Sequence, residues 1–270
     1  KMEFWQNIYS HFNPVAFSIG DIAVHWYGIM YALALLSAIF IAKWFIKYDN
    51  ININQDIFFF FFWWAEIGVI LGARLGYILF YDSNTTYYLT NPWQIFNPYV
   101  NGTYVGIAGM SYHGAFIGFI IASILFCKRK NISFWFITDI AVLGVSAAYV
   151  FGRIGNFFNQ ELVGRVTDVS WGIYVDGILR HPSQLYEAFL EGIVVFLILV
   201  YFRNRKKFDG QLALMYGIFY TIARIIAEFY REPDPQIGFI AGNWLTMGIL
   251  QSGVILVICL VLYGIKSKKI

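Results

Sequence analysis

Two arginines of this chain lie within or directly after long apolar runs, where an ionised side chain is costly. Arg153 follows the apolar stretch 132–152, and Arg224 lies inside the stretch 211–230. A charge at the middle of a membrane-spanning helix costs about 2.5 to 3.5 kcal/mol on insertion scales. A guanidinium is a planar fork of donors that matches phosphate oxygens. The pair therefore predicts a site for an anion, most naturally a phospholipid phosphate. The alternative is two independent anchors at headgroup level.

The stretch around Arg224 carries further polar residues at helical spacing. Tyr220, Arg224, Glu228 and Arg231 stand at offsets of 0, 4, 8 and 11, which at about 100° per residue is one face of a helix. That face should avoid lipid and line the interior of the protein. The plainer alternative is an i to i+4 ion pair of Arg224 with Glu228 that neutralises itself. This pair leaves Tyr220 and Arg231 on the same stripe unexplained.

Two further segments place a polar side chain near the end of an apolar run. His113 is followed by Gly114 near the end of one apolar run, and Tyr27 stands near the end of another. Glycine here permits close approach of a ligand or of a neighbouring helix. At 1.5 Å per residue, Arg224 lies about 20 Å above the cytoplasmic start of its helix. We therefore expect His113, Tyr27 and the two arginines to share one layer in the outer half of the bilayer. The alternative for His113 is a satisfied interior polar group.

The composition indicates which kind of protein must position these residues. The 270 residues are 59% hydrophobic and 13% charged, which is about half the charge of a soluble domain. Such a chain cannot stay solvated, so a soluble globular protein and a disordered one are both excluded. The net charge of +3 comes from 19 Lys and Arg that are not gathered into one basic face, so no nucleic acid partner is expected. The composition predicts an integral membrane protein whose surroundings are a lipid bilayer.

Stretches of about 20 residues that are nearly free of charge mark membrane-spanning helices. The sequence has seven such stretches, which predict an all-α polytopic integral membrane protein with seven transmembrane helices in a single membrane domain, 1–270. The stretches are 22–42, 57–81, 103–127, 132–152, 184–202, 211–230 and 244–265. Basic residues follow every second stretch, at Lys43, Arg129, Arg203 and Lys266 among others. By the positive-inside rule these connections are cytoplasmic, so the N-terminus lies outside and the C-terminus is cytoplasmic.

The outer connections are longer than the inner ones and carry signals for non-helical structure, so function is expected outside. The loop 82–102 mixes Trp93 and Tyr99 with Asn and Pro, which favours an outer interfacial arm in the headgroup region. The segment 153–183 is expected to form a small extracytoplasmic head. The short apolar–polar alternation of 170–177 predicts a hairpin in that head.

Other polar residues within the apolar stretches have a structural explanation. Asp139, Glu187 and Glu191 are predicted to form buried ion pairs with partners that the sequence does not name, and no chemistry is assigned to them. The four histidines and two cysteines show no metal-ligand spacing, so no metal and no other cofactor is expected.

Five motifs in chain order carry a resemblance to a known family. The longest is GRIGNFFNQELVG at 152–164, and the others are HWYG at 25–28, SYHG at 111–114, RHPSQLYE at 180–187 and the segment 224–234. Together they resemble the bacterial prolipoprotein diacylglyceryl transferases over most of the chain. One departure is Ala115, where the family usually has a second glycine, and an alanine still permits close packing.

The resemblance implies an enzyme that moves the diacylglyceryl group of phosphatidylglycerol to the thiol of the lipobox cysteine in a prolipoprotein signal peptide. A thioether forms and glycerol-1-phosphate is released, in the bacterial cytoplasmic (inner) membrane with the active site towards the outer leaflet. Arg153 and Arg224 would neutralise the phosphate, and His113 would either deprotonate the thiol or hydrogen-bond the lipid glycerol. The other residues that the resemblance places in the substrate site are Tyr27, Gly114, Asn156, Glu161, Gly164, Tyr220, Glu228 and Arg231.

Two rival functions remain open from the residues. An anion transporter or channel would use the stripe from Tyr220 to Arg231 as part of an arginine-lined path. It is disfavoured because no internal repeat is visible and the polar residues lie at the outer end rather than at the midplane. A different lipid-modifying transferase or phosphatase would need its own nucleophile, and no Ser, Cys or Asp suggests itself beside His113.

Overall fold

The computed structural model describes residues 2–20, 22–100, 102–104, 109–233 and 238–268. The chain is mostly helical and divides into two compact units, Lys1–Ile51 with Thr138–Ile270, and Asn52–Ile137. Among the described residues, five helices are long and apolar enough to cross a membrane. They are α2, α3, α6, the continuous helical run Ser183–Arg205, and α10. This chain is therefore a helical membrane protein.

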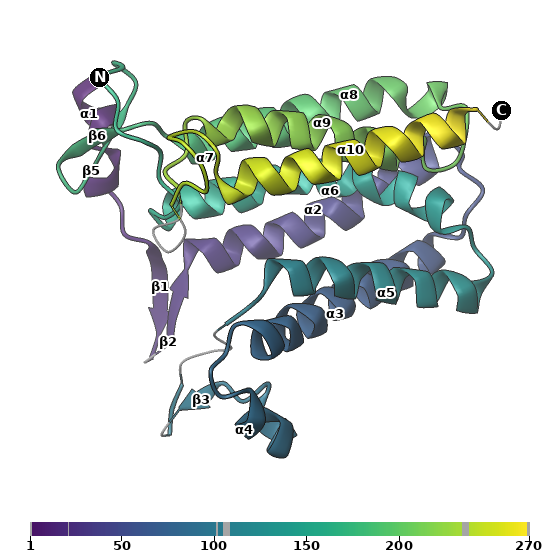
Figure 1. Ribbon diagram of the computed structural model, residues 1–270, viewed down its shortest axis with the longest axis horizontal. Helices are drawn as coiled ribbons and strands as arrows, with labels where there is room; N and C mark the ends of the chain where they lie inside the picture. Colours follow the sequence, from purple (N-terminus) through teal and green to yellow (C-terminus); the bar gives the residue numbers. More distant parts are fainter. Residues whose placement is uncertain (1, 21, 101, 105–108, 234–237, 269–270) are drawn as a thin grey trace. The chain divides into compact units, whose positions relative to one another are not determined.

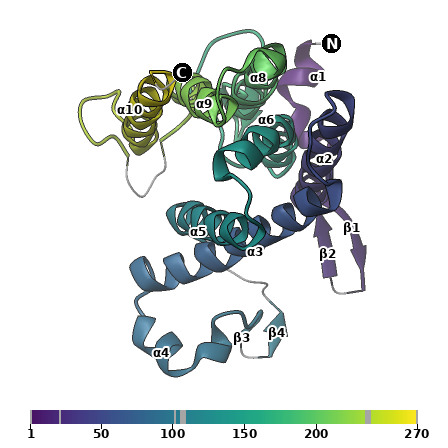
Figure 2. The same ribbon diagram turned by 90° about the vertical axis from the view of Figure 1, so that its right-hand side faces the viewer.

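The larger unit is a bundle in which distant parts of the sequence pack side by side. Figures 1 and 2 show α8, α9 and α10 next to one another, with α6 beside α2. Its core joins Phe45 of α2, Leu143 of α6, Leu199 of α8 and Leu212 of α9. The elements of this unit are α1 (Met2–Gln6), η1 (Ile8–Ser10), β1 (Val15–Ile19), β2 (Ile22–His25), α2 (Trp26–Tyr48), α6 (Phe134–Phe158), β5 (Ile173–Val175), β6 (Ile178–Arg180), α7 (Ser183–Glu187), η3 (Ala188–Val194), α8 (Val195–Phe202), η4 (Arg203–Arg205), α9 (Gln211–Glu228) and α10 (Met247–Ser267).

The smaller unit is built on two helices in backbone contact. It comprises α3 (Gln55–Phe80), α4 (Thr85–Thr90), η2 (Pro92–Gln94), β3 (Tyr99–Val100), β4 (Thr103–Tyr104) and α5 (Tyr112–Lys130). Gly68, Gly72 and Gly76 of α3 face Gly114 and Gly118 of α5, and we call these five residues the glycine seam. A Cβ at Gly118 would lie 2.0 Å from the carbonyl oxygen of Gly68. Small residues four apart permit this approach, as in other membrane helix pairs.

The loop 82–102 is tied to the glycine seam by a buried arginine. Arg74 of α3 donates from Nε to the carbonyl oxygen of Ile95 at 2.5 Å and from Nη1 to that of Gly109 at 3.2 Å. Its guanidinium carbon also lies 5.4 Å from the ring centroid of Tyr88. Because Gly109 precedes α5 closely, Arg74 connects the loop and the start of α5 to the same turn of α3.

Two of the predicted spans begin in the wrong place. The stretch 22–42 starts with a strand, since Ile22–His25 pairs with Val15–Ile19, and the helix begins only at Trp26. The stretch 103–127 starts with strand β4, and its helix begins at Tyr112, where the side chain of Ser111 accepts a hydrogen bond from the N–H of Gly114. Counting apolar residues cannot separate a short apolar strand from a helix, so both starts were placed too early. Residues 105–108 lie outside the described part of the chain.

The hairpin that the sequence predicts within 153–183 is confirmed. Strands β5 and β6 pair antiparallel around Asp176 and Gly177, whose φ values of 50° and 77° suit a tight primed turn. The N-terminal segment packs on it, since Trp5 Nε1 donates to the carbonyl oxygen of Trp171 at 2.8 Å. Tyr9 is buried with Phe157 and Ile173 in a small separate core.

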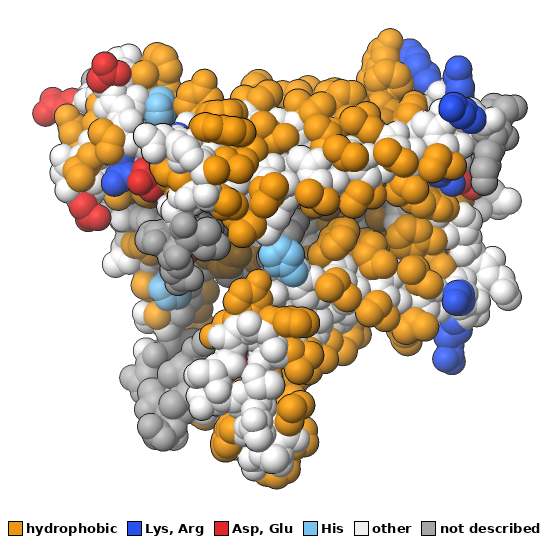
Figure 3. All heavy atoms as spheres, viewed as in Figure 1, with side chains coloured by type: hydrophobic (Ala, Val, Ile, Leu, Met, Phe, Trp, Pro, Cys, Tyr) orange, Lys and Arg blue, Asp and Glu red, His pale blue; other side chains and the backbone are white. Residues whose placement is uncertain are grey.

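Side-chain type varies along the larger unit. Figure 3 shows hydrophobic side chains covering the middle of its helices, whereas Lys and Arg gather where α8 and α10 end. Exposed apolar residues in this middle region include Leu36, Phe40, Leu197 and Val257. An apolar surface of this kind suits contact with lipid.

Candidate active site

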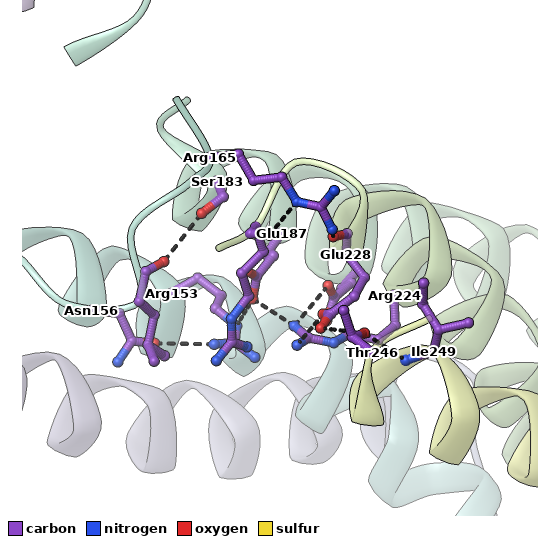
Figure 4. Close-up of polar contacts among 12 residues, drawn as sticks. Arg153, Asn156, Arg165, Ser183, Glu187, Arg224, Glu228, Thr246 and Ile249 are labelled. Carbon is purple, nitrogen blue, oxygen red and sulfur yellow. Dashed lines mark hydrogen bonds and ion pairs between the residues drawn. The ribbon is translucent and has the colours of Figure 1, made fainter. Parts of the chain in front are cut away.

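Two arginines on different helices of the larger unit contact the carboxylate of the same glutamate on a third helical element. Oε2 of Glu187, on α7, lies 3.0 Å from Nε of Arg153 on α6 and 2.9 Å from Nη1 of Arg224 on α9. The side chain of Glu187 is 0% exposed, against 15% for Arg153 and 11% for Arg224. One buried carboxylate therefore bridges the two guanidiniums, as Figure 4 shows.

A second carboxylate reaches the same arginines partly through a tyrosine. Oε1 of Glu191 lies 3.6 Å from Nη1 of Arg224, and Oε2 accepts a hydrogen bond from the hydroxyl of Tyr149. Arg153 donates from Nε to that hydroxyl at 2.7 Å, and its guanidinium carbon lies 4.8 Å from the ring centroid. Glu191 belongs to the π-helical turn η3, a rare conformation that is frequent at functional sites.

A third carboxylate fixes the other terminal nitrogen of Arg224. Oε2 of Glu228 lies 2.7 Å from Nη2 of Arg224 one turn away on α9, and Oε1 accepts a hydrogen bond from the hydroxyl of Thr246 at 2.9 Å. A Cβ at Gly248 would lie 2.6 Å from that Oε1 atom, so the glycine leaves room for the carboxylate. We call Arg153, Arg224, Glu187, Glu191 and Glu228 the arginine–glutamate cluster.

Amide side chains extend the cluster towards the head. Nη1 of Arg153 donates to Oδ1 of Asn156 at 3.3 Å, and Nδ2 of Asn156 donates to Oε1 of Glu161 at 2.7 Å. Nε2 of Gln184 donates to the carbonyl oxygen of Glu161 at 2.6 Å. The loop that follows α6 is thereby held to both Arg153 and α7.

The chain around Gly164 joins the head to the end of α9. Gly164 donates its N–H to the carbonyl oxygen of His181 at 3.1 Å, and a Cβ at Gly164 would lie 2.2 Å from that oxygen. Arg165 donates to the carbonyl oxygens of Arg231 at 2.9 Å and Glu228 at 3.1 Å. A cation that binds the last carbonyls of a helix stabilises its C-terminus. Glu228 is therefore anchored through both its side chain and its backbone.

His113 and Gly114 belong to the smaller unit. His113 is exposed on the first turn of α5, and its Nδ1 lies 3.5 Å from the hydroxyl oxygen of Tyr81. Gly114 is buried, and a Cβ there would lie 2.2 Å from the carbonyl oxygen of Gly72. Of the two alternatives for Gly114, the structure supports close approach of a neighbouring helix. Within the described part of both units, no three His, Cys, Asp or Glu side chains gather in a way that would hold a metal ion.

Comparison with known proteins gives the family. Residues 14–265 match the family model described as "Prolipoprotein diacylglyceryl transferase". The chain belongs to the prolipoprotein diacylglyceryl transferase family. The matched range includes every residue of the arginine–glutamate cluster and both His113 and Gly114.

Full-length relatives agree with this assignment. The phosphatidylglycerol–prolipoprotein diacylglyceryl transferase of Aliarcobacter butzleri is 76% identical, over 99% of this chain and 98% of the relative. A protein of the same name from Campylobacter jejuni is 60% identical over 100% of this chain and 99% of the relative. One from Wolinella succinogenes is 60% identical over 98% of this chain and 97% of the relative.

The residues that the sequence placed in the substrate site of a prolipoprotein diacylglyceryl transferase fall in both units. The larger unit holds the two arginines with Tyr27, Asn156, Glu161, Gly164, Tyr220, Glu228 and Arg231. Tyr27 is 40% exposed and packs on α6, where a Cβ at Gly155 would lie 3.4 Å from Cδ2 of Tyr27. The ring of Tyr220 lies edge-on to Tyr149, with centroids 5.5 Å apart.

Two features of the arginines go beyond or against the expectations. The sequence names no ion-pair partner for Glu187, and in the structure Glu187 contacts both Arg153 and Arg224. Arg231 was placed on the same helix face as Arg224, but α9 ends at Glu228, and Arg231 instead pairs with Gly164 as an isolated β-bridge. The predicted ion pair of Arg224 with Glu228 does form, at 2.7 Å, but it is only part of a larger cluster.

Four residues that belong to or contact the arginine–glutamate cluster are not assigned to the site from the sequence: Tyr149, Arg165, Glu187 and Glu191. The sequence predicts the two glutamates only as members of buried ion pairs, because a single sequence does not show that α7 packs against α6 and α9. One signal was available for Glu187, which closes the motif RHPSQLYE at 180–187. Tyr149 stands one helical turn before Arg153, at a spacing that brings side chains together on one face.

Proposed function

We propose that this chain is the transferase that moves the diacylglyceryl group of phosphatidylglycerol to the thiol of a lipobox cysteine in a prolipoprotein signal peptide. The products are a thioether and glycerol-1-phosphate. Family membership over residues 14–265 supports the transfer, and it removes the reason to invoke an anion transporter or channel. The observation that carries the chemistry is the pair of guanidiniums, Arg153 and Arg224, held on the buried carboxylate of Glu187.

The reaction needs charge neutralisation at the phosphate. The thiolate sulfur attacks the glycerol carbon that bears the phosphate, a C–S bond forms, and the C–O bond breaks. The electron pair of that bond leaves with the phosphate oxygen, so negative charge grows on glycerol-1-phosphate. Arginine forks that are already oriented stabilise such a developing charge without reorganising. Glu187, Glu228 and Tyr149 supply this orientation for Arg153 and Arg224.

The thiol must also lose its proton. A free cysteine has a pKa of about 8.5, so most of it is protonated at neutral pH and a base accelerates the attack. His113 takes this role in our proposal, and hydrogen bonding to the lipid glycerol is its alternative role. Its exposure on the first turn of α5 leaves the imidazole accessible to a substrate.

The remaining residues would shape the lipid site around the arginines. Asn156 and Glu161 form a hydrogen-bonded pair next to Arg153, and the tyrosines Tyr27 and Tyr220 can donate to lipid oxygens. Gly164 and Arg231 would hold the wall of the site where the head meets the end of α9. Gly114 would act indirectly, because its lack of a side chain permits α5, which carries His113, to pack closely on α3.

The membrane arrangement we propose has seven spans in one domain. Helices α5 and α9 have 19 and 18 residues, roughly 27 Å or more at 1.5 Å per residue, which is close to the thickness of the hydrocarbon core. With these two added to the five candidate spans, the N-terminus is outside and the C-terminus is cytoplasmic. The arm loop 82–102 and the head 153–183 then lie at the outer face of the bacterial cytoplasmic membrane, next to outer-leaflet phosphatidylglycerol.

The function can be tested with purified components. The detergent-solubilised protein is mixed with phosphatidylglycerol and a peptide that carries a lipobox cysteine, and the peptide mass is followed. We expect a diacylglyceryl adduct that is absent with a Cys→Ala peptide and with the Arg153→Ala enzyme. Folded protein that leaves the cysteine peptide unchanged over a range of pH would contradict the proposal.

A further inference from the structure

Glutamates outnumber arginines in the arginine–glutamate cluster. Two guanidiniums face three carboxylates, and the side chains are at most 15% exposed. With every group ionised, the cluster would carry one net negative charge. An uncompensated buried charge is unfavourable, particularly in a membrane protein. It would also repel the phosphate that the arginines are expected to bind.

The three glutamates differ in how well a cation compensates them. Glu187 receives both arginines, at 3.0 and 2.9 Å. Glu228 lies 2.7 Å from Nη2 of Arg224 and also accepts from Thr246. Glu191 is the exception, because its nearest guanidinium nitrogen is 3.6 Å away and its other oxygen accepts from a neutral hydroxyl.

The side chain of Glu191 is shielded from solvent. The residue is 0% exposed, and its Oε1 atom has no hydrogen-bond partner within the described residues. The charged and titratable groups that face it come from α6, from its own helical run and from α9: Tyr149, Arg153, Glu187, Tyr220, Arg224 and Glu228. Both cations among them are already engaged by Glu187.

We propose that Glu191 is a positioning residue that carries a proton at neutral pH, so that the cluster has no net charge before the lipid arrives. This inference rests on the proposed function, in which the arginines bind a lipid phosphate. Neutral Glu191 accepts the hydrogen bond from the hydroxyl of Tyr149, and this hydroxyl accepts one from Arg153. Loss of the proton restores the net negative charge and weakens the binding of an anionic headgroup.

The first test asks where the proton is. Infrared spectra of the purified protein at pH 7 distinguish a protonated carboxylic acid from a carboxylate by its carbonyl stretch. We expect a carboxylic acid band that disappears in Glu191→Gln and persists in Asp139→Asn, a change at a buried carboxylate outside the cluster that leaves the charge of the cluster unaltered. If the wild type lacks the band, or if Asp139→Asn rather than Glu191→Gln removes it, the inference is overturned.

The second test asks whether the proton matters for the lipid. Equilibrium binding of phosphatidylglycerol in micelles of a neutral detergent is measured without peptide, so no substrate thiol titrates, and phosphatidylcholine is the zwitterionic control. Over the pH range where the band fades, wild-type affinity should fall by about tenfold per pH unit, the slope of one linked proton. Glu191→Gln should then bind more tightly than wild type at the alkaline end. A purely structural Glu191 predicts weaker binding instead, and that result would overturn the inference.

The transfer assay on the same preparations separates the two proposals. Wild-type protein that shows the band and its pH-linked lipid binding but transfers nothing would count against the proposed function alone. The wild-type protein could instead transfer the diacylglyceryl group while its affinity for phosphatidylglycerol stays constant over the pH range where the infrared band disappears. That result would overturn only the inference about Glu191.

Discussion

The arginine–glutamate cluster and the glycine seam place their functional residues by opposite means. In the cluster, charged side chains from α6, α7, η3 and α9 meet, and orientation comes from ion pairs such as Glu187 with Arg224 at 2.9 Å. In the seam, α3 and α5 meet backbone to backbone, and His113 lies on the first turn of the helix that is packed in this way. The transfer rate should therefore depend on the charge and the guanidinium geometry of the cluster. The stability of the protein should depend on the absence of even one added methyl group in the seam.

The largest effect is expected in the glycine seam. Gly118→Ala adds a methyl group 2.0 Å from the carbonyl oxygen of Gly68, so the helices must separate. We expect a loss of about 3 kcal/mol or more in stability, the upper end of overpacking costs, seen as a lower melting temperature in detergent. Gly253→Ala on α10 is the control, because a Cβ there meets nothing within 4 Å. Equal melting temperatures for the two variants would show that the seam does not hold the helices.

The next effect is expected on activity in the arginine–glutamate cluster. Glu187→Gln keeps the shape of the side chain but removes the charge that both arginines share. Initial rates of diacylglyceryl transfer should fall by about 10²- to 10³-fold, comparable to the loss of one donor that stabilises a transition state. Circular dichroism on the same sample checks that the helices remain. Wild-type rates in Glu187→Gln would remove the bridging role of Glu187.

A buried ion pair elsewhere in the bundle sharpens the comparison. Asp139 of α6 accepts hydrogen bonds from Lys206 at 3.0 Å and from the N–H groups of Gly210 and Ala213 at the start of α9. Asp139→Asn should lower the stability by about 1–3 kcal/mol, with the transfer rate per folded molecule unchanged. Thermal denaturation and the transfer assay separate the two quantities. A large loss of rate at full stability would give Asp139 a role in the reaction that we do not assign.

The smallest effect is expected from pH at the head. Burial lowers the pKa of His181, and nearby Asp168 only partly offsets this. The neutral imidazole is therefore favoured in the folded state, so its contribution to stability is complete above about pH 6.5 and is lost as the pH falls through the lowered pKa. His181→Gln should reduce the acid-side decrease in melting temperature. An unchanged decrease would assign it to other groups.

The parts of the fold that depend on composition could be predicted from the sequence. Long apolar stretches such as 132–152 and 244–265 correspond to α6 and α10, because helix length is set by the membrane. The end of the first stretch is wrong, since α6 continues to Phe158 and Arg153 lies inside the helix and not after it. The hairpin around Asp176 could be predicted because Asp-Gly is a strong local turn signal. The starts at Trp26 and Tyr112 could not, since strand and helix are equally apolar there.

The candidate site could be predicted only where a residue stands out within its own segment. Arg153 and Arg224 are costly wherever they lie in an apolar helix, so each could be singled out. Their common partner Glu187 could not be named, because the meeting of α7 with α6 and α9 is a property of tertiary packing. The glycine seam was missed for the same reason, although Gly68, Gly72 and Gly76 recur every four residues.

In our proposal, Arg153 and Arg224 bind a phosphate as bidentate forks and do not act as ordinary buried cations. The transfer rates of Arg153→Lys, Arg224→Lys and the matched control Arg203→Lys test this role. Arg203 is also paired with a carboxylate, Asp49 at 2.9 Å, but it lies outside the cluster.

We expect Arg153→Lys and Arg224→Lys to lose about 10²-fold or more in transfer rate, because an ammonium cannot replace the bidentate fork. Arg203→Lys should transfer like the wild type. Near-normal rates for Arg153→Lys and Arg224→Lys, or an equal loss for all three variants, would contradict this role.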